Sequence, residues 1–315
     1  MKTPSRLHFG IVDMRGDLGR IHVSVGASIK KPGIILKASK ASSLRVKGPR
    51  SERVKEFAEK ILEYSEVKDG AEFNLISDIP EHAGFGSGTQ LALAVGTAIS
   101  NLYDLDLEVE EIASVLQRSR RSGVGTHAFK HGGFIVDGGH DANKPDAIPP
   151  LLFRAEVPDD WLFVVGLPDI STGFSGIKEI NAFRNLEPPS TDLIGEVSRI
   201  VLVQMMPAIL EGDMEAFGDA MTGLDSRFGD YWLKVQGGRY SHPRIEEGVK
   251  FLMENGVYGA GQSSWGPAFY SLVKGEGQAM DLKSKLCEFL NCEERKGTAF
   301  YTRADNEGAI ISCDK

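Results

Sequence analysis

The chain has 315 residues, 41% of them hydrophobic and 25% charged, with a formal net charge of −8, which together predict two folded domains and exclude a disordered chain. Because proteins that bind nucleic acids neutralise phosphates with Lys and Arg, the acidic balance argues against such a partner. No apolar run reaches the roughly 18–20 residues that span a bilayer, and no signal peptide opens the sequence. The three cysteines, Cys287, Cys292 and Cys313, lack disulfide spacing. We therefore expect a cytoplasmic protein without a membrane contact.

In the first part of the chain, the spacing of the apolar residues is first that of strands and then that of helices. In residues 20–29, Ile21, Val23 and Val25 alternate with other residues, as in a strand. From residue 51 the apolar positions are spaced as on one face of a helix. We expect strands at residues 6–13, 20–29, 33–39, 71–76 and 132–139, and helices from 51, over 89–103 and over 107–119.

The proline-containing segment 140–152 is the predicted domain boundary, because its prolines break regular structure. The first domain should then comprise residues 1–150 and the second residues 151–315. In the second we expect strands at 161–168, 257–261, 268–273, 298–303 and 308–313, and helices near 191–211, 213–228, 243–255 and 277–290. This mixture of elements predicts an α+β fold.

The most informative local feature is the loop HAGFGSGTQ (82–90), which precedes an almost wholly apolar helix. Alternating glycines permit positive φ and can turn several backbone amides toward one point. The following helix adds its unpaired N–H groups and the positive end of its dipole. The loop therefore predicts a phosphate cradle made of Gly84, Gly86, Ser87, Gly88, Thr89 and Gln90. It lacks the Gly-Lys-Ser/Thr ending of a P-loop, and the alternative is a tight turn that only joins a strand to a helix.

A second glycine-containing turn lies between two predicted strands of the other half. Its Gly261, Gln262, Ser263 and Ser264 combine close backbone approach with hydrogen-bonding side chains, and Trp265 could form a wall for a planar substrate. The alternative is a hairpin with a tryptophan in the core.

The string P-x-x-x-G-x-G-S-G-T at the start of a helix, followed by a G-A-G turn between strands, resembles the pattern of the GHMP kinase superfamily. The resemblance covers most of the chain. It implies a GHMP-type fold, with an N-terminal domain like domain 2 of ribosomal protein S5 and a ferredoxin-like C-terminal domain.

One segment argues against kinase activity. Residues 122–133 are similar to the S-G-I-D-N stretch of mevalonate kinases, and the match places Gly125 where the kinase has a catalytic Asp. Loss of a general base typically lowers a rate by about 10²–10⁴-fold. Because some kinases of the superfamily work without this Asp, an ATP-dependent small-molecule kinase remains one alternative, and a non-catalytic metabolite-binding relative is another.

Four segments, RLHFGIVDM, HAGFGSGTQLALAVG, GGFIVDGG and GQSSWGPAFY, together resemble the β-ribofuranosylaminobenzene 5′-phosphate synthase family, an archaeal, non-kinase branch of the superfamily that acts in methanopterin biosynthesis. The resemblance implies a decarboxylating glycosyltransferase. Phosphoribosyl pyrophosphate would react with 4-hydroxybenzoate or 4-aminobenzoate to give a ribofuranosyl-benzene 5′-phosphate, CO2 and pyrophosphate. It also implies Mg²⁺ as the cofactor, because the leaving pyrophosphate is highly charged. A homodimer is left open.

Under this resemblance the cradle Gly84–Gln90 and Arg6 would hold the donor, and the turn Gly261–Trp265 would hold the acceptor. Asp13 is the expected metal ligand, with Asp17 as a companion, and His8 and Asp13 are the candidate catalytic residues. The alternative for each is a strand residue that faces solvent.

Other charged residues receive weaker expectations. His127 and His131 have H-x-x-x-H spacing without a companion Glu, so we do not expect them to bind a metal. The basic run Arg118–Arg121 is expected to be a solvated helix end, and Arg239 a second contact for an anion.

Overall fold

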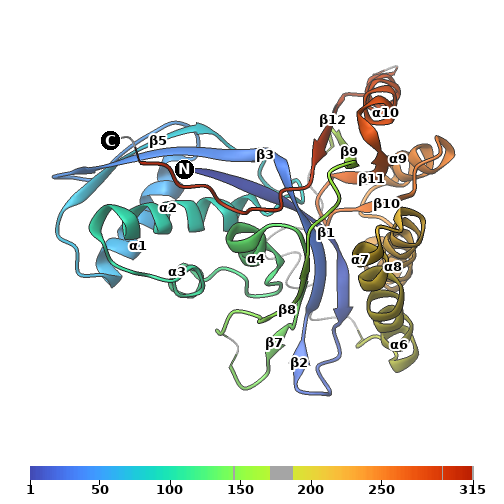
Figure 1. The fold of residues 1–315 in the computed structure, drawn as a ribbon, viewed down its shortest axis with the longest axis horizontal. Coiled ribbons are helices and arrows are strands. Elements are labelled where there is room, and N and C mark those ends of the chain that lie inside the picture. The colour runs from blue at the N-terminus through green and yellow to red at the C-terminus, as the bar shows by residue number, and fades with distance from the viewer. Residues whose placement is uncertain (145, 171–186, 293, 314–315) are drawn as a thin grey trace.

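The computed structural model describes residues 1–144, 146–170, 187–292 and 294–313. Figure 1 shows two parts side by side: long strands over a layer of helices in the first half of the chain, and a smaller sheet with its own helices in the second. The α+β fold is confirmed.

The first sheet is built around one long strand, β3 (Val23–Ala41). β1 (Lys2–Asp13) runs antiparallel along it, β6 (Phe134–Asp137) pairs with its beginning and β5 (Gly70–Ser77) with its end. The short β4 (Arg45–Lys47) lies parallel to β5, and β8 (Leu151–Ala155) pairs with β6. β2 (Arg20–Ile21) and β7 (His140–Asp141) form a separate ribbon. The strands expected at 20–29 and 33–39 therefore form one strand from Val23 on, while Arg20 and Ile21 belong to the ribbon.

Helices cover one side of this sheet (Figure 1). They are α1 (Ser51–Tyr64), α2 (Ser87–Tyr103), α3 (Val109–Val115) and α4 (Val124–His131). α2 is buried over most of its length, as its apolar sequence predicted. α4 was not expected, because Gly123 and Gly125 at its start lower helix propensity and suggest a turn.

The second sheet has the order β10-β11-β9-β12, with all neighbours antiparallel. Its strands are β9 (Trp161–Pro168), β10 (Gly259–Gln262), β11 (Phe269–Lys274) and β12 (Gly297–Arg303). Leu162 and Val164 of β9 share a core cluster with α9 (Pro243–Glu254) and α10 (Gly275–Leu290). Phe163 and Val165 belong to the cluster that contains α8 (Met214–Gln236). This order, with α9 and α10 on one face, is the predicted ferredoxin-like arrangement.

One expected domain boundary and one expected strand differ from the structure. Because β8 pairs with β6, the first sheet extends beyond the predicted boundary at residue 150, as far as Ala155. The closing strand expected at 308–313 is wrong: this segment forms a single bridge, between Ile310 and Lys2 of the first domain.

A continuous helix over residues 191–211 consists of α6 (Thr191–Arg199), η1 (Ile200–Met205) and α7 (Met206–Glu211). With 21 residues and a mean hydropathy of 1.6 in its most apolar window, it is long and apolar enough to cross a membrane, so the expectation that no such run exists was wrong. One face, with Val201 and Met205, is buried in the contact with α8, while Leu202 and Leu210 are exposed. A helix that buries one apolar face at the edge of a domain can have the same length and composition as a membrane span.

An aromatic cluster joins the two domains. The ring of Phe9 on β1 lies 5.3 Å from Tyr270, 6.1 Å from Phe163 and 6.3 Å from Phe217, between ring centroids. All four side chains are buried. The two sheets thus share one core, which fixes the walls of the cavity described next.

Candidate functional site

A cavity of about 440 Å³ lies where the two domains meet. Its walls come from β1, the first turn of α2, residues 118–122, α8, residues 239–240 and the turn between β10 and β11. Arg6, His8, Thr89, Gln262, Ser264 and Trp265 line it, so six of the predicted site residues face one space.

The glycine-rich loop forms the N-terminus of α2. The helix begins at Ser87, and Gly86, with φ of 74°, precedes it. Thr89 and Gln90 donate their amides to the Gly86 carbonyl at 3.1 Å. In the part of the chain that the structure describes, the Ser87 and Gly88 amides have no protein acceptor. These two donors and the helix dipole are available to an anion.

Arg6 packs across this loop. Its Nη1 donates to the Gly84 carbonyl, and a methyl group added at Gly86 would lie 3.2 Å from Arg6 Cγ. Gly84 and Gly86 therefore position the Arg6 side chain, which itself lines the cavity.

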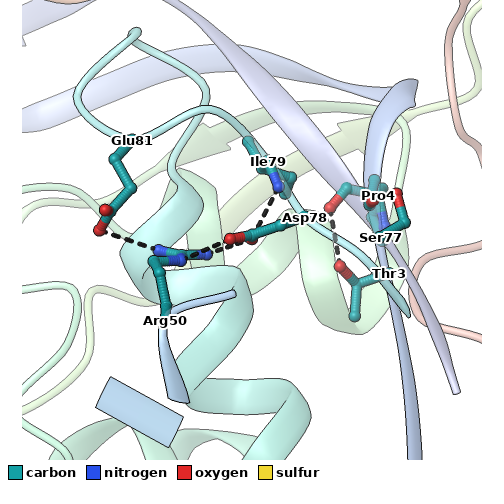
Figure 2. A network of polar contacts seen from close by, with 8 residues as sticks. Thr3, Pro4, Arg50, Ser77, Asp78, Ile79 and Glu81 are labelled. Carbon is teal, nitrogen blue, oxygen red and sulfur yellow. Dashed lines mark hydrogen bonds and ion pairs between the residues drawn. The ribbon is translucent and has the colours of Figure 1, made fainter. Parts of the chain in front are cut away.

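The chain that leads into the loop is held by an ion pair (Figure 2). Arg50, which precedes α1, donates from Nε to Asp78 Oδ2 at 2.6 Å and from Nη1 to Glu81 at 3.3 Å. The Asp78 carboxylate also accepts the Ile79 amide at 2.7 Å. Further on, the Phe85 ring is buried 6.0 Å from Phe300. The loop is thus fixed on both sides of Pro80.

The second glycine-containing turn contributes differently from what was expected. Gln262 donates to the Gly266 carbonyl and to Ser241, each at 2.7 Å, so its amide stabilises the turn. Ser263 is fully buried and bonded to the first domain. Gly261 packs on Asp225, because a methyl group there would lie 2.8 Å from the Asp225 carboxyl carbon. Of the predicted acceptor-binding residues, Trp265, Ser264 and Gln262 line the cavity.

A buried carboxyl group that was not predicted lies in the cavity wall. Asp225 of α8 accepts the Gln262 amide on Oδ1 and the Tyr240 hydroxyl on Oδ2, both at 2.8 Å. Burial raises the pKa of Asp225 to about 7, and burial and Asp225 raise the pKa of Tyr240. The available signal was the position of Asp225 on the apolar stripe of the helix, one turn after Met221.

Five arginines line the same cavity, and we call them the arginine cluster: Arg6, Arg118, Arg120, Arg121 and Arg239. Arg118 Nε is buried without a protein acceptor in the described residues. Its pKa is lowered by burial and by the neighbouring Arg53 and Arg120. The expectation of a solvated helix end was therefore wrong for Arg118. Such a cluster suits a ligand with several phosphate groups.

His8 and Asp13, the predicted catalytic residues, are in different environments. His8 lines the cavity, and burial together with Arg6 lowers its pKa to about 3, so its ring is neutral. Asp13 lies at the far end of β1 and outside the cavity lining, where it accepts the Arg15 amide at 2.6 Å. Arg15 pairs with Asp17 at 2.9 Å. Of the described residues that line the cavity, the one with a carboxyl group is Asp225, not Asp13.

An aromatic wall closes one side of the cavity. Trp265 and Trp232 are in a T-shaped contact with centroids 4.7 Å apart, and both line the space with Phe228. This wall can hold a flat ring against an apolar surface.

The cavity residues do not fit a protein-built Mg²⁺ site. Mg²⁺ prefers oxygen ligands, with one or two carboxylates and substrate phosphates. Among the described lining residues Asp225 is the one carboxylate, and the five arginines of the arginine cluster oppose a cation. The expected Mg²⁺ therefore stays a prediction.

Comparison with known proteins places this geometry in a superfamily. Residues 52–133 match the GHMP kinases N terminal domain, and residues 205–292 match the GHMP kinases C terminal domain. Among solved structures, a homoserine kinase from Cytophaga hutchinsonii has a TM-score of 0.68 at 15% identity, covering 98% of this chain and 96% of that one. A galactokinase from Lactococcus lactis complexed with galactose has a TM-score of 0.68 at 14% identity, covering 98% and 93%. The fold is that of the GHMP kinases.

Closer relatives are named β-ribofuranosylphenol 5′-phosphate synthase. The one from Archaeoglobus fulgidus is 32% identical, over 99% of this chain and 98% of its own. The one from Methanocaldococcus jannaschii is 28% identical, over 99% of both chains. The chain belongs to the β-ribofuranosylphenol 5′-phosphate synthase family, a family of synthases within the GHMP kinase superfamily.

Proposed function

We propose that the protein joins the ribose of phosphoribosyl pyrophosphate to the ring of 4-hydroxybenzoate, with release of CO2 and pyrophosphate. The name of the relatives contains a ribofuranosylphenol, so the hydroxylated ring is favoured over the amino-substituted one. The observation that carries the proposal is that the arginine cluster, an aromatic wall and a buried carboxyl group face one cavity.

The donor would lie against the arginine cluster and the start of α2. Phosphoribosyl pyrophosphate has a phosphate at one end and a pyrophosphate at C1, and both need charged hydrogen-bond donors. Arg118 lies beside the loop, because a methyl group at Gly88 would be 3.6 Å from its Nη1. As the bond from C1 to the pyrophosphate breaks, guanidinium groups stabilise the charge that develops on the leaving group.

The acceptor ring would lie on Trp265. The ring carbon that bears the carboxylate, para to the hydroxyl, attacks C1 of the ribose as the pyrophosphate leaves. The bond from this carbon to the carboxylate then breaks, CO2 departs, and the electron pair restores the aromatic ring. A poorly hydrated cavity favours the loss of CO2, because the charged carboxylate group disappears in this step.

Asp225 is our candidate for the catalytic base. The attack is faster when the phenolic hydroxyl loses its proton, because the oxygen then donates electron density to the para carbon. A carboxylate with a pKa of about 7 can accept this proton near neutral pH and return it to the phenolate oxygen after CO2 has left. The Tyr240 hydroxyl, 2.8 Å away, holds Asp225 in place.

Kinase activity is the competing function. Gly125 lies in α4, where its carbonyl accepts the Gln90 side chain at 2.8 Å, and it brings no carboxylate to this position. The two kinases compared above are 14–15% identical to this chain, so their likeness shows the fold alone.

The direct test is release of CO2 from carboxyl-labelled 4-hydroxybenzoate, with and without phosphoribosyl pyrophosphate and Mg²⁺. We expect release only with the donor, together with one equivalent of pyrophosphate, and a lower rate with 4-aminobenzoate. No release with either benzoate would reject the proposal, and phosphorylation of an alcohol by ATP would establish the kinase. We further propose that the product enters methanopterin biosynthesis, as the resemblance implies. Feeding the product to a cell extract would check this step.

A further inference from the structure

Three metal-ligating side chains that play no part in the proposed reaction meet between α3 and α4. They are Glu110 of α3 with His127 and His131 of α4, and one ligand atom from each lies within 4.8 Å of the others. None of the three lines the cavity between the domains. We propose that these residues bind a divalent transition-metal ion of the Zn²⁺ type.

The state of His127 carries the proposal. This side chain is 3% exposed, and its Nε2 lies 2.7 Å from the Pro149 carbonyl, to which it must donate. The proton is therefore on Nε2, and Nδ1 has a lone pair. Nδ1 is buried without a protein partner in the described residues. An imidazole that donates one N–H to a backbone carbonyl and presents its other nitrogen is the usual arrangement of a metal-bound histidine, and a buried nitrogen without a partner requires such an explanation.

The other two ligands lie close to His127, because one ligand atom from each of the three side chains lies within 4.8 Å of the others. His131 lies one turn after His127, on the same face of α4, and the two rings are 6.1 Å apart with their planes at 19°. The carboxylate comes from the neighbouring helix, which is why the spacing of the two histidines alone did not predict the site.

One neighbouring charge opposes a cation. Lys130 donates to the two Glu110 oxygens at 2.8 and 3.0 Å, and to Glu108 at 3.2 Å. Each carboxylate oxygen of Glu110 keeps a further lone pair, and Glu108 shares the lysine charge. The site can therefore take a cation while Lys130 stays in place, but it would bind more tightly without Lys130.

Two imidazoles and one carboxylate match Zn²⁺, Co²⁺ or Ni²⁺ and not the oxygen-seeking Mg²⁺. His131 and Glu110 are half-exposed, so solvent can reach the ion and water can complete its coordination. A bound ion would tie α3 to α4. Because α4 also holds the Gln90 side chain of α2 through Gly125, the ion would stabilise the helix layer behind the glycine-rich loop.

The test uses untagged full-length protein, treated with EDTA and then dialysed. Co²⁺ is titrated by visible absorption, and Zn²⁺ by calorimetry and by its effect on the melting temperature. We expect one ion per chain and a higher melting temperature with Zn²⁺. Because His127 is buried and its loss would disturb packing, Glu110→Gln and His131→Ala carry the test, and each should weaken binding by at least about tenfold.

Matched controls separate ligation from surface charge. Glu111→Gln removes the adjacent carboxylate, which bonds Tyr64, and His82→Ala removes an exposed histidine; both should bind as the wild type does. Lys130→Gln should bind more tightly. Substoichiometric Zn²⁺ binding by the wild type, or unchanged affinity in both Glu110→Gln and His131→Ala, would overturn the proposal. These readouts do not depend on release of CO2.

Discussion

The Ser263 hydroxyl donates a 2.6 Å hydrogen bond to the Gly84 carbonyl, which joins two glycine-containing segments that lie 179 residues apart in the sequence. The same oxygen accepts the His8 amide at 3.0 Å, and the Ser264 amide approaches the His8 carbonyl at 3.4 Å. One buried hydroxyl thus connects the first strand, the glycine-rich loop and the turn between β10 and β11, which together form one end of the cavity.

Replacing this hydroxyl should loosen the cavity. Ser263→Ala leaves the buried His8 amide without an acceptor, so we expect the free energy of unfolding to fall by about 1–3 kcal/mol and the KM for phosphoribosyl pyrophosphate to rise. Urea unfolding and donor kinetics measure the two effects. Ser5→Ala is the control, because Ser5 is equally buried on β1 but its hydroxyl has no partner in the described residues. Equal losses in the two variants would contradict the role of Ser263.

Two glycines with the same backbone conformation allow a matched comparison. Gly86 has φ of 74° and Gly212 has φ of 72°, so alanine at either position should cost about 1–2 kcal/mol of backbone strain. At Gly86 the new methyl group would also meet Arg6 at 3.2 Å, whereas at Gly212 it would meet nothing within 4 Å. We therefore expect similar melting temperatures, but weaker donor binding by calorimetry only in Gly86→Ala. Equal donor affinity in the two variants would show that the loop does not position Arg6.

Local patterns predicted most of the fold. The alternation in 20–29 and the apolar run from Leu91 gave correct elements, because period and burial act over a few residues. The start of α4 was missed since glycines at a helix start look like a turn, and the strand expected at 308–313 failed because its partner, Lys2, touches it at one residue only. Such pairing depends on the tertiary arrangement and not on propensity.

The site was predicted only in part, because some of its residues also depend on the tertiary arrangement. The glycine-rich loop shows its function in consecutive residues, whereas Asp225 and Arg118 acquire theirs from burial by distant elements. Asp13 looked suitable because it shares a strand with His8, yet the strand carries it away from the cavity. Glu110 and His127 similarly meet only through the packing of two helices.

Arg118 should contribute a large part of donor binding. Arg118→Gln removes a guanidinium whose buried Nε has no protein acceptor in the described residues. We expect roughly 10- to 100-fold weaker binding of phosphoribosyl pyrophosphate, which is the loss of a hydrogen bond to a charged group. Arg45→Gln, which removes an exposed arginine paired with Glu72, should leave binding unchanged. A similar affinity in both variants would argue that the donor binds elsewhere.

The buried Asp225 predicts a pH dependence of stability. Its folded pKa of about 7 lies above the ordinary value of 3.8, so its contribution is fully present below pH 3.8 and is lost as the pH rises to about 7. Asp225→Asn cannot ionise, and its stability relative to the wild type should therefore increase from pH 4 to pH 7. His8 and His22, with pKa values lowered to about 3 and about 4, lose their contribution as the pH falls below 6.5, but they act equally in both proteins. Asp219→Asn, on the exposed side of the same helix, should show no such trend in urea unfolding.

Asp225 should also set the pH dependence of the reaction. If its carboxylate accepts the phenolic proton, kcat/KM for 4-hydroxybenzoate should rise with pH through about 7 and then level off. Asp225→Asn keeps the shape of the side chain and an oxygen for the Gln262 amide, so the fold should persist while the rate falls by about 10²–10⁴-fold. The variant should also lose the rise near pH 7, which a purely structural role would leave in place. Tyr240→Phe removes the hydrogen bond that orients the carboxylate and one donor that stabilises its charge, so we expect a smaller loss of rate and a rise displaced to higher pH. A full rise near pH 7 in Asp225→Asn would assign the base to another group.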